Sequence, residues 1–446
     1  MILLTFAVAA AGIIGTFADR APLEAPAPTT SHARAALYIE DLAGVRTGII
    51  SAPQRAANTR IINAQLSRGA RLHLHAGTRI EIARTLKIGS GGGIVGDSST
   101  DRPIIFLPAA EFNNTNDVAD QGRYGPNAVG IDFSGELSGS LRPSAGVDLE
   151  NLKIVSERKA GRRLRGIVGR NVADCVIRNV EISGFPMAIG IALASARRCR
   201  VTGTYIHDFA DDTPWRLLPQ STGIEVDNDI IRGIPSSGTT IDHFRIERLR
   251  VGGKLLAKWG YQTDSINILS SALETRIADG RISEVGEGID TFGSNGSIDN
   301  VVIDNAYIFG LKFIHGAAGN RASNVSITNP GLAGLIFAGS DWAKKDTAAN
   351  VVTGIRISNI DPAGVWKANS TAGIIVSGRN SKHVPTGNQV IDAQIDLGPG
   401  GKYGWLDQST GSRNRGTAIR IKGGRSLDRP ILIMYGGGSV RGARPS

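Results

Sequence analysis

The chain has 446 residues, of which 41% are hydrophobic, 20% are charged and only 5% are aromatic, and its formal net charge is +10. This composition excludes a disordered protein, and two cysteines are too few for a disulfide scaffold or for several zinc sites. The 57 glycines favour turns and strands over helices, and the basic charge favours an anionic partner: nucleic acid, acidic lipid or acidic polysaccharide.

The first 18 residues have the features of an export signal. Ile2 to Ala18 carry no charge and are mostly apolar, and Thr16-Phe17-Ala18 offers a small-residue cleavage site. A run rich in Pro and Ala follows, so we predict a signal peptide over 1–18, a linker over 19–36 and a secreted or periplasmic protein. An uncleaved anchor and a misassigned start are the alternatives. No later segment is apolar enough to cross a bilayer, so no integral membrane domain is expected.

Residues 37–110 are predicted to form an N-terminal cap and the first coils of the fold. Ser51 stands where a helix N-cap is expected, Pro53 stands at the second helical position, and Gly69 stands where the helix would end. One face of this helix would carry Ile61, Ile62 and Leu66. Strand-like alternation follows over 71–82. A helix beside short strands suits the open end of a stacked solenoid.

A repeat of short alternating segments runs through residues 111–425. Each copy has an apolar anchor, commonly an Asn two positions later, and in nearly every copy a second apolar residue five positions after the anchor. The anchors are Leu149, Ile177, Val201, Ile246, Ile277, Ile303, Ile327 and Ile357. Between them lies a second pattern, Gly-[Ile/Leu]-x-apolar. It begins at Gly130, Gly190, Gly223, Gly288, Gly310, Gly334 and Gly373.

Strands this short cannot bury an apolar face alone, and the 3.6-residue period of helical repeats is absent. A coil of three strands, stacked on the next coil about 4.8 Å away, satisfies both patterns. We therefore predict an all-β fold: a single-stranded right-handed parallel β-helix of about a dozen coils, with a C-terminal tail over 426–446. Leucine-rich repeats are the alternative, but their signature is missing. The recurring Asn residues should stack and bond to one another at the turns.

The two cysteines lie at equivalent positions of adjacent coils. Cys175 and Cys199 each precede an anchor by two residues. They should therefore stack, point inward and lie close enough for a disulfide, although the sequence leaves a reduced pair equally open. A bond would support export.

The predicted helix, the segment from Ala70 to Ile80 and the motif Gly93-Ile94-Val95-Gly96-Asp97 carry a resemblance to a known family. They resemble the N-terminal region of the pectate-lyase-like β-helix superfamily, with its pectate-lyase-3, polygalacturonase-like and phage-tailspike branches. The likeness covers residues 40 to 425 and concerns fold more than chemistry. It implies that a polysaccharide is bound or cleaved along a groove on one strand face. The family includes polysaccharide lyases, hydrolases, uronate epimerases and noncatalytic spikes.

The x position of the glycine pattern should point outward, because its neighbours point into the core. The predicted outward column reads Asp132, Ala192, Glu225, Gln262, Asp290, Lys312, Ile336 and Ile375. Residues that could join its charged middle are Asp227, Asp264, Glu287 and His315. Aromatic residues on or near the loops beside it are suited to stack on sugars. They are Trp215, Trp259, Tyr261, Trp342 and Trp366, and we predict substrate binding by these residues with Glu225, Asp227 and Gln262.

Three interpretations of this column remain open. In a lyase, one group neutralises the carboxylate of a uronate and a base removes a proton, with acidic residues holding a divalent cation such as calcium. In a hydrolase, two carboxylates flank the glycosidic bond. In a noncatalytic protein, Asp290 and Lys312 are only a surface ion pair of at most about 1 kcal/mol. The candidate catalytic residues are Asp264, Glu287, Asp290, Lys312, His315 and Arg356.

Motif comparison within the superfamily favours none of the known chemistries strongly. Polygalacturonase-type hydrolases carry Asn-Thr-Asp, Gly-Asp-Asp, Gly-His-Gly and Arg-Ile-Lys on successive coils. Here the corresponding segments are Gln262-Thr263-Asp264, Glu287-Gly288-Ile289-Asp290, Ile314-His315-Gly316 and Arg356-Ile357-Ser358. The paired acids are therefore split, and the epimerase motif Asp-Pro-His-Asp is missing.

We therefore expect an exported protein that acts on an acidic, uronate-containing polysaccharide, with eliminative cleavage ahead of hydrolysis. A noncatalytic glycan-binding or structural β-helix is the alternative. A basic cluster between Arg158 and Arg200 lacks any nucleic-acid-binding signature, so no nucleic-acid partner is expected. The outward apolar Ile336 and Ile375 would be covered either by a loop or by a subunit contact in a homotrimer.

Overall fold

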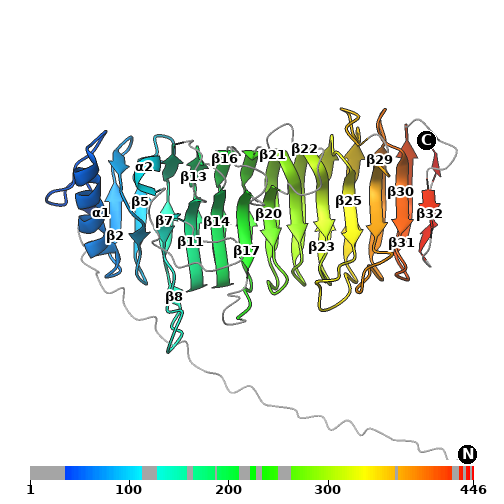
Figure 1. The fold of residues 1–446 in the computed structure, drawn as a ribbon, viewed down its shortest axis with the longest axis horizontal. Coiled ribbons are helices and arrows are strands. Elements are labelled where there is room, and N and C mark those ends of the chain that lie inside the picture. The colour runs from blue at the N-terminus through cyan, green and yellow to red at the C-terminus, as the bar shows by residue number, and fades with distance from the viewer. Residues whose placement is uncertain are drawn as a thin grey trace, which may run out of the picture. The chain divides into compact units, whose positions relative to one another are not determined.

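The computed structural model describes residues 36–112, 128–157, 164–185, 188–209, 221–227, 234–249, 263–366, 370–423, 431–434, 438–441 and 444–445. The chain divides into Met1–Ala36 and Leu37–Ser446, and the fold is that of the second unit. Its strands lie side by side in a long stack, and the strand pairs are parallel (Figure 1). Within the described ranges, no helix is both long and apolar enough to cross a membrane.

Successive coils stack their strands on three faces, which we call A, B and C in the order in which the chain meets them. Face A contains β1 (Leu37–Tyr38), β2 (Arg71–Leu74), β5 (Gly93–Gly96), β9 (Asp148–Glu150), β12 (Val176–Arg178), β15 (Arg200–Thr202), β18 (Thr240–Asp242), β23 (Arg321–Ser323), β26 (Val351–Thr353) and β33 (Ser439–Arg441). Face B contains β3 (Arg79–Glu81), β6 (Ile104–Leu107), β10 (Lys153–Ser156), β13 (Glu181–Ser183), β16 (Tyr205–Phe209), β19 (Arg245–Leu249), β24 (Ser326–Thr328), β27 (Arg356–Ser358) and β34 (Arg444–Pro445).

Face C contains β4 (Leu86–Lys87), β7 (Ala128–Asp132), β11 (Leu164–Ala173), β14 (Ala188–Arg197), β17 (Thr222–Asp227), β20 (Asp264–Ile268), β25 (Ala333–Ala338), β28 (Ala372–Ser377), β30 (Tyr403–Gln408) and β32 (Ile431–Ile433). The long strands β21 (Arg276–Thr291) and β22 (Ser297–Phe313) run through all three faces. Strands β29 (Gln389–Asp396) and β31 (Arg415–Lys422) run through A and B, and β8 (Ser144–Ala145) pairs with the end of β11.

Helix α1 (Ala52–Leu66) covers the first coil, as predicted. Ser51 is its N-cap residue with an extended backbone, and Gly69 follows its end at a φ of +81°. Ile62 and Leu66 are buried in the core. The buried Asn58 donates from Nδ2 to the carbonyls of Arg46 and Glu81, which ties the helix to the first strands. A second short helix, α2 (Ala109–Phe112), follows β6.

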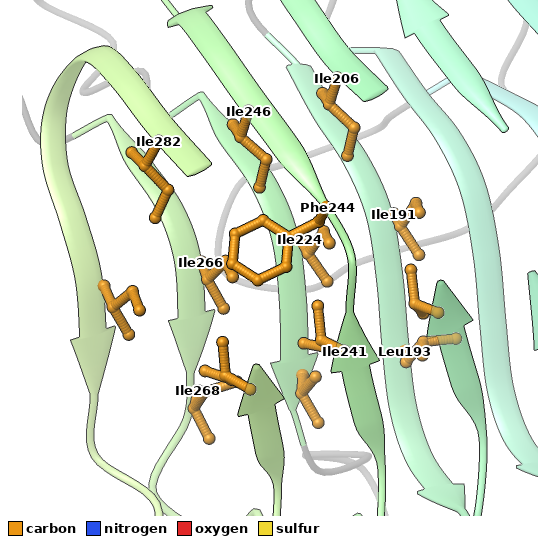
Figure 2. Close-up of a cluster of buried hydrophobic side chains, with 14 of the residues drawn as sticks. Ile191, Leu193, Ile206, Ile224, Ile241, Phe244, Ile246, Ile266, Ile268 and Ile282 are labelled. Atoms are coloured by element: carbon orange, nitrogen blue, oxygen red, sulfur yellow. The ribbon is translucent and has the colours of Figure 1, made fainter. Parts of the chain in front are cut away.

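The interior is built from columns of stacked apolar residues. On face B the column consists of Ile80, Ile105, Ile154, Ile182, Ile206, Ile246, Ile282, Ile303, Ile327, Ile357, Ile395 and Ile421. Figure 2 shows part of this interior, where Ile206, Ile246 and Ile282 form one row and Ile191, Ile224 and Ile266 of face C form another. Each buried isoleucine contributes about 1.5–3 kcal/mol. The parallel β-helix of about a dozen coils is confirmed.

The predicted register of the anchors is wrong after Val201. Val201 pairs with Ile241, whereas Ile246 pairs with Ile206 on face B. The anchors that belong to face B are Ile246, Ile303, Ile327 and Ile357. The error has a physical cause, because both faces present an apolar residue followed two positions later by a left-handed turn residue, as at Ile303 and Asn305.

Every glycine of the second pattern except Gly130, which lies opposite Leu107, makes room for an isoleucine of face B across the interior. A Cβ at Gly223, Gly288 or Gly310 would lie within 3.0 Å of the side chain of an isoleucine: Ile246, Ile303 or Ile327. The structure adds two members that the pattern missed. They are Gly166, opposite Ile182, and Gly404, opposite Ile421. The close approach of faces B and C therefore explains these nine of the 57 glycines.

We expect Gly334→Ala to lower the free energy of unfolding by about 1–3 kcal/mol, because the interior cannot expand around an added methyl group. The three atoms nearest to that methyl would all belong to Ile357, at 2.6–2.8 Å. Adding Ile357→Ala should relieve the clash, so the double variant should lose less stability than the sum of the two single losses. Urea unfolding of the three variants measures this coupling, and additive losses would contradict it.

Stacked asparagines occupy the turns, as predicted. Asn179 donates from Nδ2 to Asn151 Oδ1 at 3.1 Å, and Asn359 donates to Asn329 Oδ1 at 2.6 Å. Asn151, Asn179, Asn329 and Asn359 all adopt the left-handed backbone that Asn tolerates well. A further buried ladder, which the sequence analysis missed, runs through Asn320, Asn350, Asn388 and Asn414 with Nδ2-to-Oδ1 distances of 2.9, 2.8 and 3.0 Å.

Cys175 and Cys199 form a disulfide between adjacent coils, with their Cα atoms 4.5 Å apart. This settles the alternative that the sequence left open in favour of the oxidised pair. Residues 431–445, which we had separated from the β-helix as part of a tail, contain β32, β33 and β34. These strands pair with β30 and β31 and add a further partial coil.

Candidate functional site

Strands β20, β21 and β22 lie in the middle of the stack (Figure 1). On the outer side of face C they bring four ionisable side chains together. Asp264 begins β20, Glu287 and Asp290 lie near the end of β21, and Lys312 lies near the end of β22. Asp264 is the register partner of Glu287, and Asp290 is the register partner of Lys312. All four residues are buried, with at most 4% of any of them exposed. We call this group the carboxyl cluster.

A local irregularity of the strand explains why Glu287 and Asp290, three positions apart, lie on the same side of β21. The pairing of β21 with β20 and with β22 skips Gly288, whose missing Cβ allows the Gly310 carbonyl oxygen to approach to 2.3 Å of the Cβ position. The alternation of a regular strand is therefore broken at this glycine. Ile289 points into the core, and the two acids that Gly288 and Ile289 separate in the sequence are brought together.

Lys312 holds two of the three carboxyl groups. Its Nζ donates to Glu287 Oε2 at 2.8 Å and to Asp290 Oδ2 at 2.9 Å. The third carboxyl group is held differently, because Asn267 donates from Nδ2 to Asp264 Oδ2 at 2.9 Å. Within the part of the chain that the structure describes, four buried oxygen atoms of the cluster and its neighbour have no hydrogen-bond partner: Asp264 Oδ1, Asn267 Oδ1, Glu287 Oε1 and Asp290 Oδ1.

Three carboxyl groups share one ammonium group, so their charges cannot all be neutralised. Burial raises the pKa of Asp290 to about 7, and the nearby Glu287 adds to the rise although Lys312 opposes it. Burial and the charges of Glu287 and Asp290 raise the pKa of Asp264 well above its ordinary value. The pKa of Lys312 is also raised, because the attraction of the three carboxyl groups outweighs the cost of burying its charge. The cluster therefore holds protons on carboxyl groups at neutral pH.

The three acids could in principle hold a metal ion, since one oxygen from each lies within 4.8 Å of the others. The calcium ion that we considered from the sequence requires six to eight oxygen ligands. Lys312 Nζ already binds one oxygen of Glu287 and one of Asp290 and supplies a positive charge at the same place. The arrangement therefore fits a divalent cation poorly and fits proton chemistry well.

The outward column differs from the predicted one at two positions. Val168 stands between Asp132 and Ala192, and Asn267 stands where Gln262 was predicted. The pattern missed Val168 because its coil has Gly169 at the fourth position, where the ring of Phe133 fills the space in place of a side chain.

The outer side of face C is also far less exposed than a surface stripe would be. Apolar residues cluster on it at both sides of the carboxyl cluster. They are Val129, Val168, Ile189 and Ala192 on one side, and Phe309, Ala333, Ile336, Ile375 and Leu406 on the other. Trp366 packs against the second group and donates from Nε1 to the Tyr307 carbonyl. Ile336 and Ile375 are therefore covered within the chain itself.

Two of the predicted catalytic residues belong to other groups of side chains. His315 follows β22 in a turn, where its Nδ1 lies 2.5 Å from Ser340 Oγ and its ring packs between Phe292 and Trp342. Arg356 begins β27 on face B and is exposed. From the sequence, Arg356 is a candidate only through the likeness of Arg356-Ile357-Ser358 to the Arg-Ile-Lys motif, and the structure places it away from the cluster.

The predicted binding residues are only partly described. Glu225 is half-buried in β17 and is the register partner of Asn267, so it lies one coil before the cluster. Asp227 ends β17, and its side chain lies outside the described structure. Trp342 lies on the loop after β25 and is exposed. The residues Trp215, Trp259, Tyr261 and Gln262 lie outside the described residues.

Two polar residues at the site escaped the sequence analysis. Asn267 donates a hydrogen bond to Asp264. Ser340 Oγ shares a hydrogen bond with His315 Nδ1 and accepts another from the backbone N–H of Trp342. The alternation Ser265-Ile266-Asn267-Ile268 could have revealed Asn267, because an isolated polar residue between two core isoleucines marks an outward position.

A family model described as a right-handed β-helix region matches residues 165–390. The chain belongs to this family. Three solved structures show how widely the β-helix is shared. One is the tailspike protein of E. coli bacteriophage HK620, solved in complex with a pentasaccharide. Its TM-score is 0.65 at 10% identity, with 92% of this chain and 72% of its own chain covered. A family 28 exopolygalacturonase of Yersinia enterocolitica has a TM-score of 0.61 at 11% identity, with 92% of this chain and 79% of its own chain covered.

The third β-helix structure is the A-module of mannuronan C-5 epimerase AlgE6 from Azotobacter vinelandii. Its TM-score is 0.51 at 12% identity, with 92% of this chain and 99% of the module covered. No curated protein sequence matches the chain. At such low identities these likenesses establish the β-helix fold and leave the chemistry to the residues of the site.

Proposed function

We propose that this β-helix protein hydrolyses glycosidic bonds of a polysaccharide at the carboxyl cluster. The observation that carries the proposal is that three buried carboxyl groups on adjacent coils lie together with one lysine, which bonds to only two of them. Burial raises the pKa of Asp290 to about 7, and the nearby Glu287 adds to the rise although Lys312 opposes it. A glycosidase needs one protonated carboxyl group as general acid and one carboxylate as base or nucleophile. Asp264 or Asp290 supplies the proton, and Glu287, which Lys312 orients, supplies the carboxylate.

The geometry supports hydrolysis over the eliminative cleavage that the sequence favoured. A lyase needs an unprotonated base to remove the proton beside the uronate carboxylate. The raised pKa of Lys312 keeps it an ammonium group. Its bonds to Glu287 and Asp290 also leave it poorly placed to neutralise a substrate carboxylate.

A second candidate function is noncatalytic glycan binding, and the burial of the carboxyl cluster favours it. Asp264, Glu287 and Asp290 have no exposed surface in this conformation, so a sugar must displace whatever covers them before it can react. A spike or polysaccharide-handling factor would use the stack only as a rigid support.

We further propose that the protein is exported and that its substrate is acidic. The Cys175–Cys199 disulfide supports export, because such bonds persist in oxidising compartments. The net charge of +10 supports a polyanionic substrate.

The test is incubation of the purified full-length protein with polygalacturonate, polymannuronate and a neutral glucan. Hydrolysis releases reducing ends without ultraviolet absorbance, whereas elimination produces an absorbing unsaturated product. New reducing ends that disappear in the Glu287→Gln variant support the proposal. Binding of a polymer without any cleavage, under conditions where the protein is folded, would favour the noncatalytic candidate instead.

A further inference from the structure

The loop between β25 and β26 carries an exposed tryptophan whose ring packs against a histidine ring. Trp342 is 79% exposed. Its ring lies nearly parallel to that of His315, with 5.8 Å between centroids and 12° between planes. His315 in turn packs edge-on against Phe292, with 4.5 Å between centroids. The exposed part of the Trp342 ring offers a planar apolar surface on which a ligand can stack.

Hydrogen bonds fix this loop before any ligand arrives. The backbone N–H of Trp342 donates to Ser340 Oγ at 3.1 Å, and the backbone N–H of Ser340 donates to the His383 carbonyl at 2.9 Å. The backbone N–H of Lys382 donates to Asp341 Oδ1 at 2.7 Å. The loop around Trp342 is thus joined to the loop around Lys382, and little conformational entropy remains to be lost on binding.

The two joined loops carry more positive than negative charge. Their basic residues are Lys344, Lys345, Arg379 and Lys382. Their acidic residues are Asp341, which accepts from the backbone of Lys382, and Asp346, which accepts from the backbone of Val384 and lies 3.4 Å from His383. Lys344 and Lys382 are exposed. The surroundings of Trp342 therefore complement an anionic group.

The two aromatic residues that support Trp342 lie close to the carboxyl cluster along the chain. Phe292 comes two residues after Asp290, and His315 comes three residues after Lys312. Three residues of extended chain span at most about 10 Å. A polysaccharide lying along face C can therefore contact Trp342 while it passes over the carboxyl cluster, whose side chains it reaches only by displacing what covers them.

We propose that Trp342 stacks on a sugar ring of an acidic polysaccharide and that Lys344 and Lys382 attract its carboxylate or sulfate groups. Aromatic planes suit the apolar faces of pyranose rings, and exposed cations attract polyanions over several ångströms. The inference rests on the proposed glycan-acting function and names the class of sugar polymer and the subsite that binds it.

Binding of the full-length protein to polygalacturonate, polymannuronate and neutral dextran, measured by isothermal titration calorimetry, tests this subsite without requiring turnover. Trp342→Ala should weaken binding to an acidic polymer at least about tenfold, as expected for a central aromatic contact, and Trp342→Phe should restore most of it. The Lys344→Gln/Lys382→Gln pair should weaken binding and flatten its salt dependence. Lys87→Gln is the matched control, because Lys87 is exposed on face C at the other end of the stack.

Several outcomes would overturn the subsite. They are unchanged binding by Trp342→Ala, dextran bound as tightly as the acidic polymers, an equal loss in Lys87→Gln, or no binding of either acidic polymer. Acidic polymer bound through Trp342 but never cleaved would support the subsite while refuting hydrolysis. Cleavage that persists unaltered in Trp342→Ala together with unaltered binding would refute the subsite and leave hydrolysis standing.

Discussion

Lys312→Met is expected to lower the free energy of unfolding by about 3–5 kcal/mol at neutral pH. Lys312 Nζ lies within 2.9 Å of oxygens of both Glu287 and Asp290, and all three side chains are at most 5% exposed. Methionine fills a similar volume, so the loss would come from carboxylates left in a low-dielectric interior without a counter-charge. Urea unfolding at pH 7 measures it, and the loss should shrink at acidic pH, where the carboxyl groups become neutral.

Two further variants separate charge from packing in this experiment. Lys422→Met removes a lysine whose Nζ lies 3.0 Å from Asp396, but there the lysine side chain is 61% exposed, so a loss of at most about 1 kcal/mol is expected. Adding Glu287→Gln and Asp290→Asn to Lys312→Met should recover most of the lost stability. Equal losses at Lys312 and Lys422, or no recovery, would show that Lys312 does not balance the buried charges.

The fold could be predicted because every coil of the stack requires similar residue types at equivalent positions. The glycine pattern is a clear case, since nearly every copy marks a place where an isoleucine closely approaches the backbone, as Ile327 does at Gly310. The register failed after Val201 because faces A and B impose the same local requirements: an apolar residue followed by a left-handed turn residue. Only the pairing partners, such as Ile246 with Ile206, distinguish the two faces, and they are separated by a coil of variable length.

The sequence could predict which residues of the site point outward, because this depends only on the alternation of side chains along a strand. Alternation alone placed Asp290 and Lys312 outward, and the structure brings Asp264 and Glu287 to the same place. Burial was not predictable, because pointing outward from a coil differs from being exposed to water, and what covers a face is decided by distant segments. Arg356 shows the limit of motif likeness, since Arg356-Ile357-Ser358 resembles a catalytic motif but lies on face B.

Asp264→Asn should raise the free energy of unfolding at neutral pH by roughly 1–3 kcal/mol. The pKa of Asp264 is raised by burial and by the charges of Glu287 and Asp290, whereas in the unfolded chain the same group ionises near pH 4. Folding at pH 7 must therefore take up a proton, and this cost grows as the pH rises from the unfolded pKa toward the folded one. Asparagine is neutral at every pH and can still accept from Asn267. Thermal unfolding between pH 3 and pH 8 should show a gain that vanishes below about pH 4.

The same Asp264→Asn variant should lose turnover by about 10²–10⁴-fold if Asp264 serves in general acid–base catalysis, because an amide cannot deliver the proton. Asp407→Asn is the matched control: Asp407 is another buried aspartate on face C, its pKa is also raised by burial, and it contacts Ser409 rather than the carboxyl cluster. That control should leave turnover unchanged. A more stable but inactive Asp264→Asn variant means that the chain retains a destabilising acid for its chemistry. A variant that is less stable at pH 7 would instead mean that Asp264 is ionised in the folded protein, which would remove the proton donor from the proposed reaction.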